Sequence, residues 1–124
     1  MKIGFIGLGN MATAIIGGLL REGTTLSDKN GNATVITAAN IIGSAKTEAT
    51  RQKRAEQFGV AVTASNREVA EAADVLVLAV KSQFFSEVIA EIRDAVSENT
   101  LVISIAAGLT LERIAGLFDR DVTA

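Results

Sequence analysis

The chain contains neither cysteine nor histidine among its 124 residues. Without cysteine there is no disulfide framework and no thiolate nucleophile. Without histidine the chain cannot assemble a Ser-His-Asp triad or use an imidazole as a general base. A transition-metal site within this chain would have to be built from carboxylates alone. These absences exclude thiol and histidine chemistry from this chain.

Long apolar runs and an excess of basic residues are also missing. The longest runs, "DVLVLAV" and "TLVISIAAGL", are much shorter than the ~20 residues of a membrane-spanning helix. The first residues lack the basic stretch and cleavage site of a secretory signal and read as a strand. The net charge of −2 gives no electrostatic footprint for nucleic acid. We therefore expect a cytoplasmic protein without membrane or nucleic-acid partners.

Short apolar runs alternate with segments of helical periodicity along the chain. In the helical segments, apolar residues recur at three- and four-residue spacing. "DVLVLAV" is uninterrupted, which is typical of a strand buried on both faces of a parallel sheet. The predicted strands are residues 2–6, 40–45, 60–63, 74–80 and 100–107. The alternation predicts an α/β fold, a doubly wound, Rossmann-like parallel sheet, in one domain over residues 1–124.

Cap residues mark the ends of the predicted helices. Serine and threonine hydroxyls accept hydrogen bonds from first-turn amides, and glycine ends a helix in a left-handed conformation. Ser65 and Glu68 also match a capping box, in which the Glu68 side chain reaches back to the Ser65 amide. The predicted caps are Thr47, Ser65, Ser86 and Thr110 at helix starts, and Gly23 and Gly59 at helix ends.

Two polar stretches fall outside this alternation. "EGTTLSDKNGNAT", residues 22–34, has no apolar period and is expected to be a surface loop. The following "TVITAA" is compatible with a lead-in turn or with a longer strand. At the other end, "RDVTA" stands where another strand would begin, so we expect the last strand to be truncated.

A glycine-rich turn follows the first predicted strand and opens the first predicted helix. Gly7, Gly9 and Ala12 form a G-x-G-x-x-A motif. Gly7 permits the sharp turn, Gly9 lets pyrophosphate oxygens approach the backbone, and Ala12 allows close helix–sheet packing. Free amides at the helix start favour the anion. A plain turn is the alternative, but the strand–turn–helix context favours a dinucleotide site that also includes Leu8, Asn10 and Met11.

The second strand decides which dinucleotide is expected. NAD sites place an acid about 20 residues beyond the glycines, at a strand end. Asp28 has nearly that spacing, but it lies in the polar stretch, so we reject it. The predicted tip contains Ser44, Ala45 and Lys46, and Arg51 follows one turn into the helix. Hydroxyls and cations suit a 2′-phosphate, so NADP(H) is preferred and NAD(H) is the alternative. Lys46 and Arg51 could instead be solvated helix charges.

Three segments in order carry a family resemblance. "IGFIGLGNMATAIIGGL", "ASNREVAEAADVLVLAVKSQ" and "LVISIAAGLTLERI" resemble the N-terminal domain of pyrroline-5-carboxylate reductases. The resemblance implies hydride transfer from a nicotinamide to the C=N carbon of 1-pyrroline-5-carboxylate, giving L-proline. It also implies that substrate-carboxylate contacts and the homo-oligomer interface lie in a C-terminal helical domain absent from this chain. The catalytic residues are therefore unknown from these 124 residues.

The resemblance further implies cofactor contacts beyond the glycine turn. It assigns Asn66 to the adenine ribose, although Asn66 could instead be a helix cap. It also assigns two strand-end segments, which should lie at the carboxyl edge of the sheet where ligands bind. For these the alternatives are an exposed charge at Lys81 and a plain helix-entry turn after the fifth strand. The assigned segments are Ala79, Val80 and Lys81, and Ala106, Ala107 and Gly108.

Two other functions stay open at this stage. A β-hydroxyacid dehydrogenase also begins with "GFIGLGNM", but "SIAAGLTLERI" argues against it. A non-catalytic reductase-like protein could bind NADP(H) as a regulatory module. An assay with pyrroline-5-carboxylate and NADPH would distinguish these alternatives from a reductase.

Overall fold

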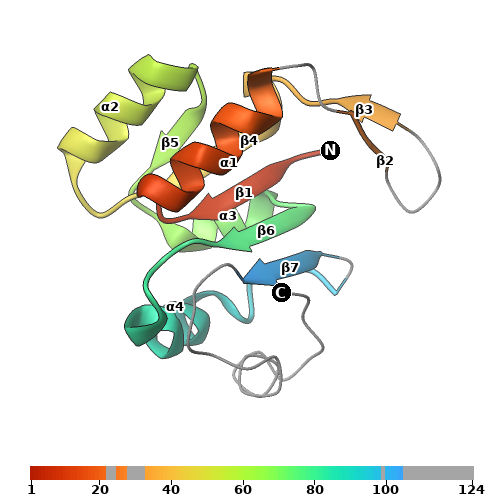
Figure 1. The fold of residues 1–124 in the computed structure, drawn as a ribbon. Helices are drawn as coiled ribbons and strands as arrows, with labels where there is room; N and C mark the ends of the chain where they lie inside the picture. Colours follow the sequence, from red (N-terminus) through yellow and green to blue (C-terminus); the bar gives the residue numbers. More distant parts are fainter. Residues whose placement is uncertain (22–24, 28–32, 99, 105–124) are drawn as a thin grey trace.

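Five parallel strands form the main sheet, in the order β5-β4-β1-β6-β7. The computed structural model describes residues 1–21, 25–27, 33–98 and 100–104 (Figure 1). The strands of this sheet are β1 (Ile3–Ile6), β4 (Ile41–Ser44), β5 (Ala61–Thr63), β6 (Val75–Leu78) and β7 (Leu101–Ser104). The α-helices are α1 (Asn10–Arg21), α2 (Glu48–Phe58), α3 (Asn66–Ala72) and α4 (Phe85–Ile92). The predicted doubly wound fold is confirmed.

Helices cover both faces of this sheet (Figure 1). Helices α1 and α2 pack together on one face, and α3 and α4 pack together on the other. Successive strand residues point to opposite faces, so Phe5 lies in one core cluster and Ile6 in the other. Burying a large apolar side chain contributes about 1.5–3 kcal/mol, so both layers need unbroken apolar strands. This explains why "DVLVLAV" does not alternate with polar residues.

The carboxyl ends of the strands meet in register at one edge of the sheet. Ile6 pairs with Ser44 on one side and with Leu78 on the other, and Leu78 pairs with Ser104. The order of the strands reverses at β1. After β1 and α1 the chain adds β4 and β5 on one side, and it then adds β6 and β7 on the other side of β1. Ligands of open parallel sheets bind at such a switch point. The fold therefore directs attention to the turn after β1.

Two of the predicted N-caps are confirmed. The Thr47 hydroxyl accepts from the Thr50 amide at 3.3 Å, and the Ser65 hydroxyl accepts from the Glu68 amide at 3.2 Å. Gly59 ends α2 with a φ of 70°. The second half of the predicted capping box is wrong, because the Glu68 carboxylate accepts from the Thr63 hydroxyl at 2.8 Å instead. Gly23 and Thr110 lie outside the described residues.

The predicted cap at Ser86 is also wrong. Helix α4 begins at Phe85, and Phe84 occupies its N-cap position without a side-chain hydrogen bond. A 3₁₀ turn, η2 (Ser82–Phe84), leads directly into the helix, and the Phe84 amide donates to the Lys81 carbonyl at 2.9 Å. Phe85, the first residue of the helix, is 1% exposed, so packing of its side chain accounts for a start ahead of Ser86.

A hairpin corrects the expectation of a surface loop over residues 22–34. Strands β2 (Thr25–Ser27) and β3 (Ala33–Val35) pair antiparallel as a separate two-stranded sheet (Figure 1). "TVITAA" is accordingly divided between β3, a short link and the 3₁₀ turn η1 (Ala38–Asn40). Val35 is exposed, so β3 lacks the burial in the core on which the other strand predictions depend. Asp28 lies outside the described residues.

Candidate functional site

The turn after β1 brings its backbone against the end of β6. Gly7 has a φ of +97°, a region that favours glycine. A Cβ placed on Gly7 would lie 3.0 Å from the Ala79 carbonyl oxygen. The Gly7 amide donates to the Ser44 carbonyl at 3.0 Å, and the Ala79 amide donates to the Ile6 carbonyl at 2.9 Å. Gly7 therefore joins the ends of three strands in one compact turn.

Gly9 differs from Gly7 because no described residue crowds it. Apart from its two chain neighbours, a Cβ placed on Gly9 would meet no atom of the described residues within 4 Å. Among the same residues no acceptor is found for the Gly9 N–H, and the first amides of α1 have no intrahelical acceptor either. The turn thus presents backbone donors and the positive end of a 12-residue helix to an open space. An anion such as a pyrophosphate fits this arrangement.

A cleft of about 370 Å³ opens beside this turn at the carboxyl edge of the sheet. Nine of the predicted site residues line it: Gly7, Gly9, Ser44, Ala45, Lys46, Asn66, Ala79, Val80 and Lys81. Leu8 and Ala12 are buried behind the turn, whereas Asn10 and Met11 are exposed at the start of α1. Ala106, Ala107 and Gly108 lie outside the described residues.

The far wall of the cleft comes from η2 and α4 and was not anticipated. Its residues Phe84, Glu87, Val88 and Glu91 recur at three- and four-residue spacing, which places them on one helical face. This stripe directly after "AVKSQ" is the sequence signal that could have identified the wall. Gln83 also lines the cleft. The wall adds two carboxylates and an aromatic ring to a cleft that Lys46 and Lys81 also line.

Polar contacts hold the strand tips in place. The buried Ser44 hydroxyl donates to Asn66 Oδ1 at 2.6 Å, so the Asn66 side chain is fixed at the start of α3. Ser65 supplies the cap of α3, as predicted, and the Asn66 amide group borders the cleft. Lys46 Nζ lies 4.7 Å from the centre of the Phe84 ring, within reach of a cation–π contact.

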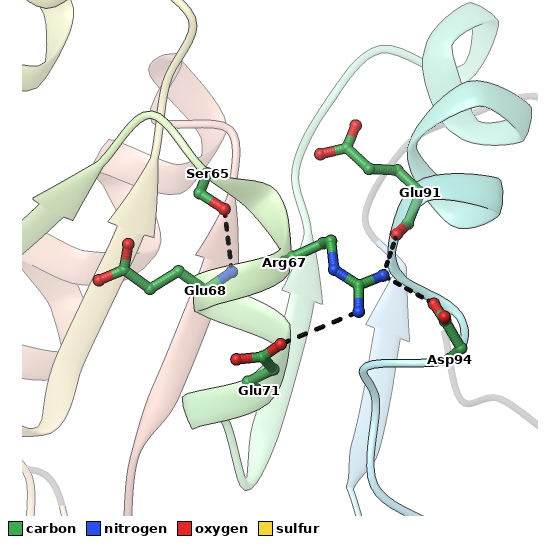
Figure 2. Close-up of polar contacts among 6 residues, drawn as sticks. All are labelled: Ser65, Arg67, Glu68, Glu71, Glu91 and Asp94. Atoms are coloured by element: carbon green, nitrogen blue, oxygen red, sulfur yellow. Dashed lines mark hydrogen bonds and ion pairs between the residues drawn. The ribbon is translucent and has the colours of Figure 1, made fainter.

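Arg67 ties α3, which carries Asn66, to α4, which carries three residues of the far wall. Its guanidinium donates to the Asp94 carboxylate at 2.8 Å and to the Glu91 carbonyl at 3.0 Å, and Glu71 lies 4.0 Å away (Figure 2). The hydrogen bond from Arg67 lowers the pKa of Asp94 below its ordinary value of 3.8. Figure 2 shows these side chains bridging the gap between the two helices, beside the Ser65 cap.

The Arg67–Asp94 bond makes a testable contribution to acid stability. Because the pKa of folded Asp94 is lowered, the contribution is present above the ordinary value of 3.8 and disappears as the pH falls through the lowered value. We expect Asp94→Asn to lower the Tm slightly at neutral pH, and expect the difference from wild type to vanish in strong acid. Circular dichroism melts across this range measure it, with Glu56→Gln on the exposed side of α2 as the control. A Tm difference that does not change with pH would contradict the assignment.

A turn with free amides at the head of a helix, beside a cleft at the switch point of a parallel sheet, is the arrangement of a Rossmann-type domain. Comparison with known families places the domain more narrowly. The chain belongs to the family described as "NADP oxidoreductase coenzyme F420-dependent", whose model matches residues 2–108. No helix among the described residues has the length and hydropathy needed to cross a membrane.

Several relatives and solved structures are pyrroline-5-carboxylate reductases, which confirms the predicted resemblance. The enzyme from Escherichia coli K12 is 39% identical over 120 residues, which are 97% of this chain and 40% of that protein. The structure of the Coxiella burnetii reductase matches with a TM-score of 0.81 and 35% identity, over 94% of this chain and 39% of that one. A Plasmodium falciparum reductase with NADP bound matches with a TM-score of 0.68 and 27% identity, over 95% and 38%. This chain thus spans about 40% of the curated relative from E. coli.

Proposed function

We propose that this chain is the NADP(H)-binding part of a pyrroline-5-carboxylate reductase, which reduces 1-pyrroline-5-carboxylate to L-proline. One observation carries the proposal: the uncrowded Gly9 turn opens onto the cleft in a chain that resembles this enzyme over 97% of its length. Bound NADP(H) would supply the hydride for the C=N bond. The substrate contacts and a homo-oligomer interface would lie in the part of the relatives that this chain does not span, and we place the activity in the cytoplasm.

Each group that lines the cleft has a role in this proposal. The amides of Gly9 and the first turn of α1 hold the pyrophosphate. Asn66, oriented by Ser44, faces the adenine ribose. Lys46 pairs with the 2′-phosphate after leaving the Phe84 ring. The small residue Ala79 leaves room beside the nicotinamide, and Val80 and Lys81 line the same side of the cleft. We propose the same side for Ala106, Ala107 and Gly108, and we place Leu8, Asn10, Met11 and Ala12 in the turn itself.

Lys46→Ala is expected to weaken NADPH binding about tenfold and to leave NADH binding within about twofold of wild type. The lysine is the cleft cation on the strand tip, and a hydrogen bond to a charged group contributes about 1.5–3 kcal/mol. Calorimetric titration with both cofactors measures the two affinities.

Lys53→Ala serves as the matched control for this variant. Lys53 is exposed on α2 and does not line the cleft, so both affinities should stay at wild-type values. Equal losses of NADPH and NADH in Lys46→Ala would contradict the assignment of the 2′-phosphate to this strand tip.

The 124-residue chain is expected to bind NADPH yet to reduce pyrroline-5-carboxylate at least ~1000-fold more slowly than the E. coli relative. Rate acceleration depends on holding both reactants in one geometry, and no residue of this chain is assigned to the substrate carboxylate. Steady-state assays of the two proteins side by side measure the difference. Comparable rates would show that the catalytic groups lie within these residues.

A chimera tests the substrate directly. In it, this chain replaces the matching N-terminal part of the E. coli enzyme, and it should reduce pyrroline-5-carboxylate with NADPH. The same chimera with Gly9→Val is the control and should not. Failure of the wild-type chain to bind either NADPH or NADH would overturn the proposed function. Binding without turnover in the folded chimera would instead favour a regulatory NADP(H)-binding protein.

A further inference from the structure

Arg54 is a buried cation directly behind the glycine turn. It lies on α2, and its residue is 9% exposed. Its Nε donates to the Leu8 carbonyl at 2.9 Å, and its Nη1 donates to Gln57 Oε1 at 2.9 Å. The ion pairs among the described residues all involve Arg67, so no described carboxylate neutralises this guanidinium. A buried charge without a counter-ion is costly, so its position calls for an explanation.

The position of the hydrogen bond suggests what this charge does. The Leu8 carbonyl and the Gly9 N–H belong to one planar trans peptide, in which the two groups point in opposite directions. Drawing the carbonyl toward Arg54 therefore turns the Gly9 N–H away from α2. Gly9 borders the cleft, and no described residue accepts this N–H. A charged donor on the carbonyl also polarises the peptide, which strengthens its N–H as a donor.

Arg51, one turn earlier on the same helix, contacts a different loop. Its Nη1 donates to the Ala45 carbonyl at 2.8 Å and to the Lys46 carbonyl at 3.2 Å. These carbonyls belong to the strand tip that carries Lys46, not to the glycine turn. Arg51 thus braces the segment proposed for the 2′-phosphate, whereas Arg54 braces the segment proposed for the pyrophosphate.

We propose that Arg54 and Arg51 are positioning residues that let α2 set the two anion subsites of the cofactor independently. Arg54 fixes the Leu8–Gly9 peptide so that the Gly9 N–H is available to the pyrophosphate, and it adds positive charge behind that subsite. Arg51 fixes the backbone of Ala45 and Lys46 and so places the Lys46 ammonium. This inference rests on the proposed binding of NADP(H).

The test measures three ligands against three variants by calorimetry or ligand-detected NMR. NADPH and NADH share the pyrophosphate, whereas adenosine 2′-monophosphate lacks it. Arg54→Met should weaken NADPH and NADH by the same factor, about 5- to 20-fold, and leave adenosine 2′-monophosphate unchanged. Arg51→Met should weaken NADPH and adenosine 2′-monophosphate and leave NADH near its wild-type affinity. Arg54→Lys, which keeps a cation and a donor, should recover part of the lost NADH affinity.

Thermal unfolding separates positioning from general stability. Methionine removes the cost of burying the cation but also the hydrogen bond to the Leu8 carbonyl, so the Tm should change little while affinity falls. Three results would overturn the proposal. The first is an equal loss of affinity for all three ligands, and the second is unchanged NADH affinity in Arg54→Met. The third is a ratio of NADPH to NADH affinity that changes in Arg54→Met but not in Arg51→Met. If Arg54→Met does not fold, an unchanged NADH affinity in Arg54→Lys together with an unchanged cofactor ratio in Arg51→Met would also overturn it. Wild-type binding of NADPH distinguishes these outcomes from failure of the proposed function.

Discussion

Gly9→Val is expected to abolish measurable NADPH binding, a loss of at least ~100-fold, while the chain stays folded. Apart from its chain neighbours, a Cβ at position 9 has no atom of the described residues within 4 Å, so there is space for the side chain to begin. It fills the space beside the Gly9 N–H, where a pyrophosphate oxygen would have to approach. Affinity should therefore be lost without a matching loss of stability.

Gly18→Val is the matched control for this variant. Gly18 lies on α1, also has space for a Cβ with no described neighbour within 4 Å, and does not border the cleft. The same substitution there should keep NADPH affinity at the wild-type value, and valine has a slightly higher helix propensity than glycine. Fluorescence titration of NADPH alongside far-ultraviolet circular dichroism measures both properties. A folded Gly9→Val chain with wild-type affinity would rule out the turn as the phosphate cradle.

Gly7→Ala is expected to destabilise the fold, whereas Gly9→Val is expected to lower affinity and leave the fold stable. Alanine at a φ of +97° is strained by about 1–3 kcal/mol, and its Cβ would lie 3.0 Å from the Ala79 carbonyl oxygen and 3.1 Å from Val80 Cγ1. We expect the Tm to fall by roughly 5–15 °C. Differential scanning calorimetry measures the shift. A wild-type Tm would mean that the turn can adopt another backbone conformation.

Much of the fold follows from local signals in the sequence. Apolar runs of strand length, separated by helical periodicity, give the parallel sheet, because each strand must be buried on both faces. Thr47 and Ser65 mark helix starts through hydroxyl groups that act on their own first turns. The glycine turn is likewise a local signal, and the structure places it beside the cleft.

The features that were missed depend on contacts between segments. Ser86 satisfies the residue preference for a cap, but the burial of Phe85 sets the helix start. Glu68 reaches Thr63 on the neighbouring strand and not its own cap. Nothing in the spacing of α2 shows that Arg51 and Arg54 donate to two different loops, because this depends on where those loops lie in space.

The cleft is assembled from segments that are distant along the chain, which has a consequence for the order of folding. The Lys2 amide bonds the Asp74 carboxylate 72 positions away, and β1 pairs with β6 directly beside this contact. Such pairings are slow to form, because a long loop must close before they gain any stabilising contact. Gly7 and Ala79 meet only after that closure. A chain in which β1 and β4 are paired but β6 is not would have only half of the cleft. Binding of the proposed cofactor would therefore report on the pairing of β6 with β1. By mass action, it would also favour the chains in which this pairing is complete.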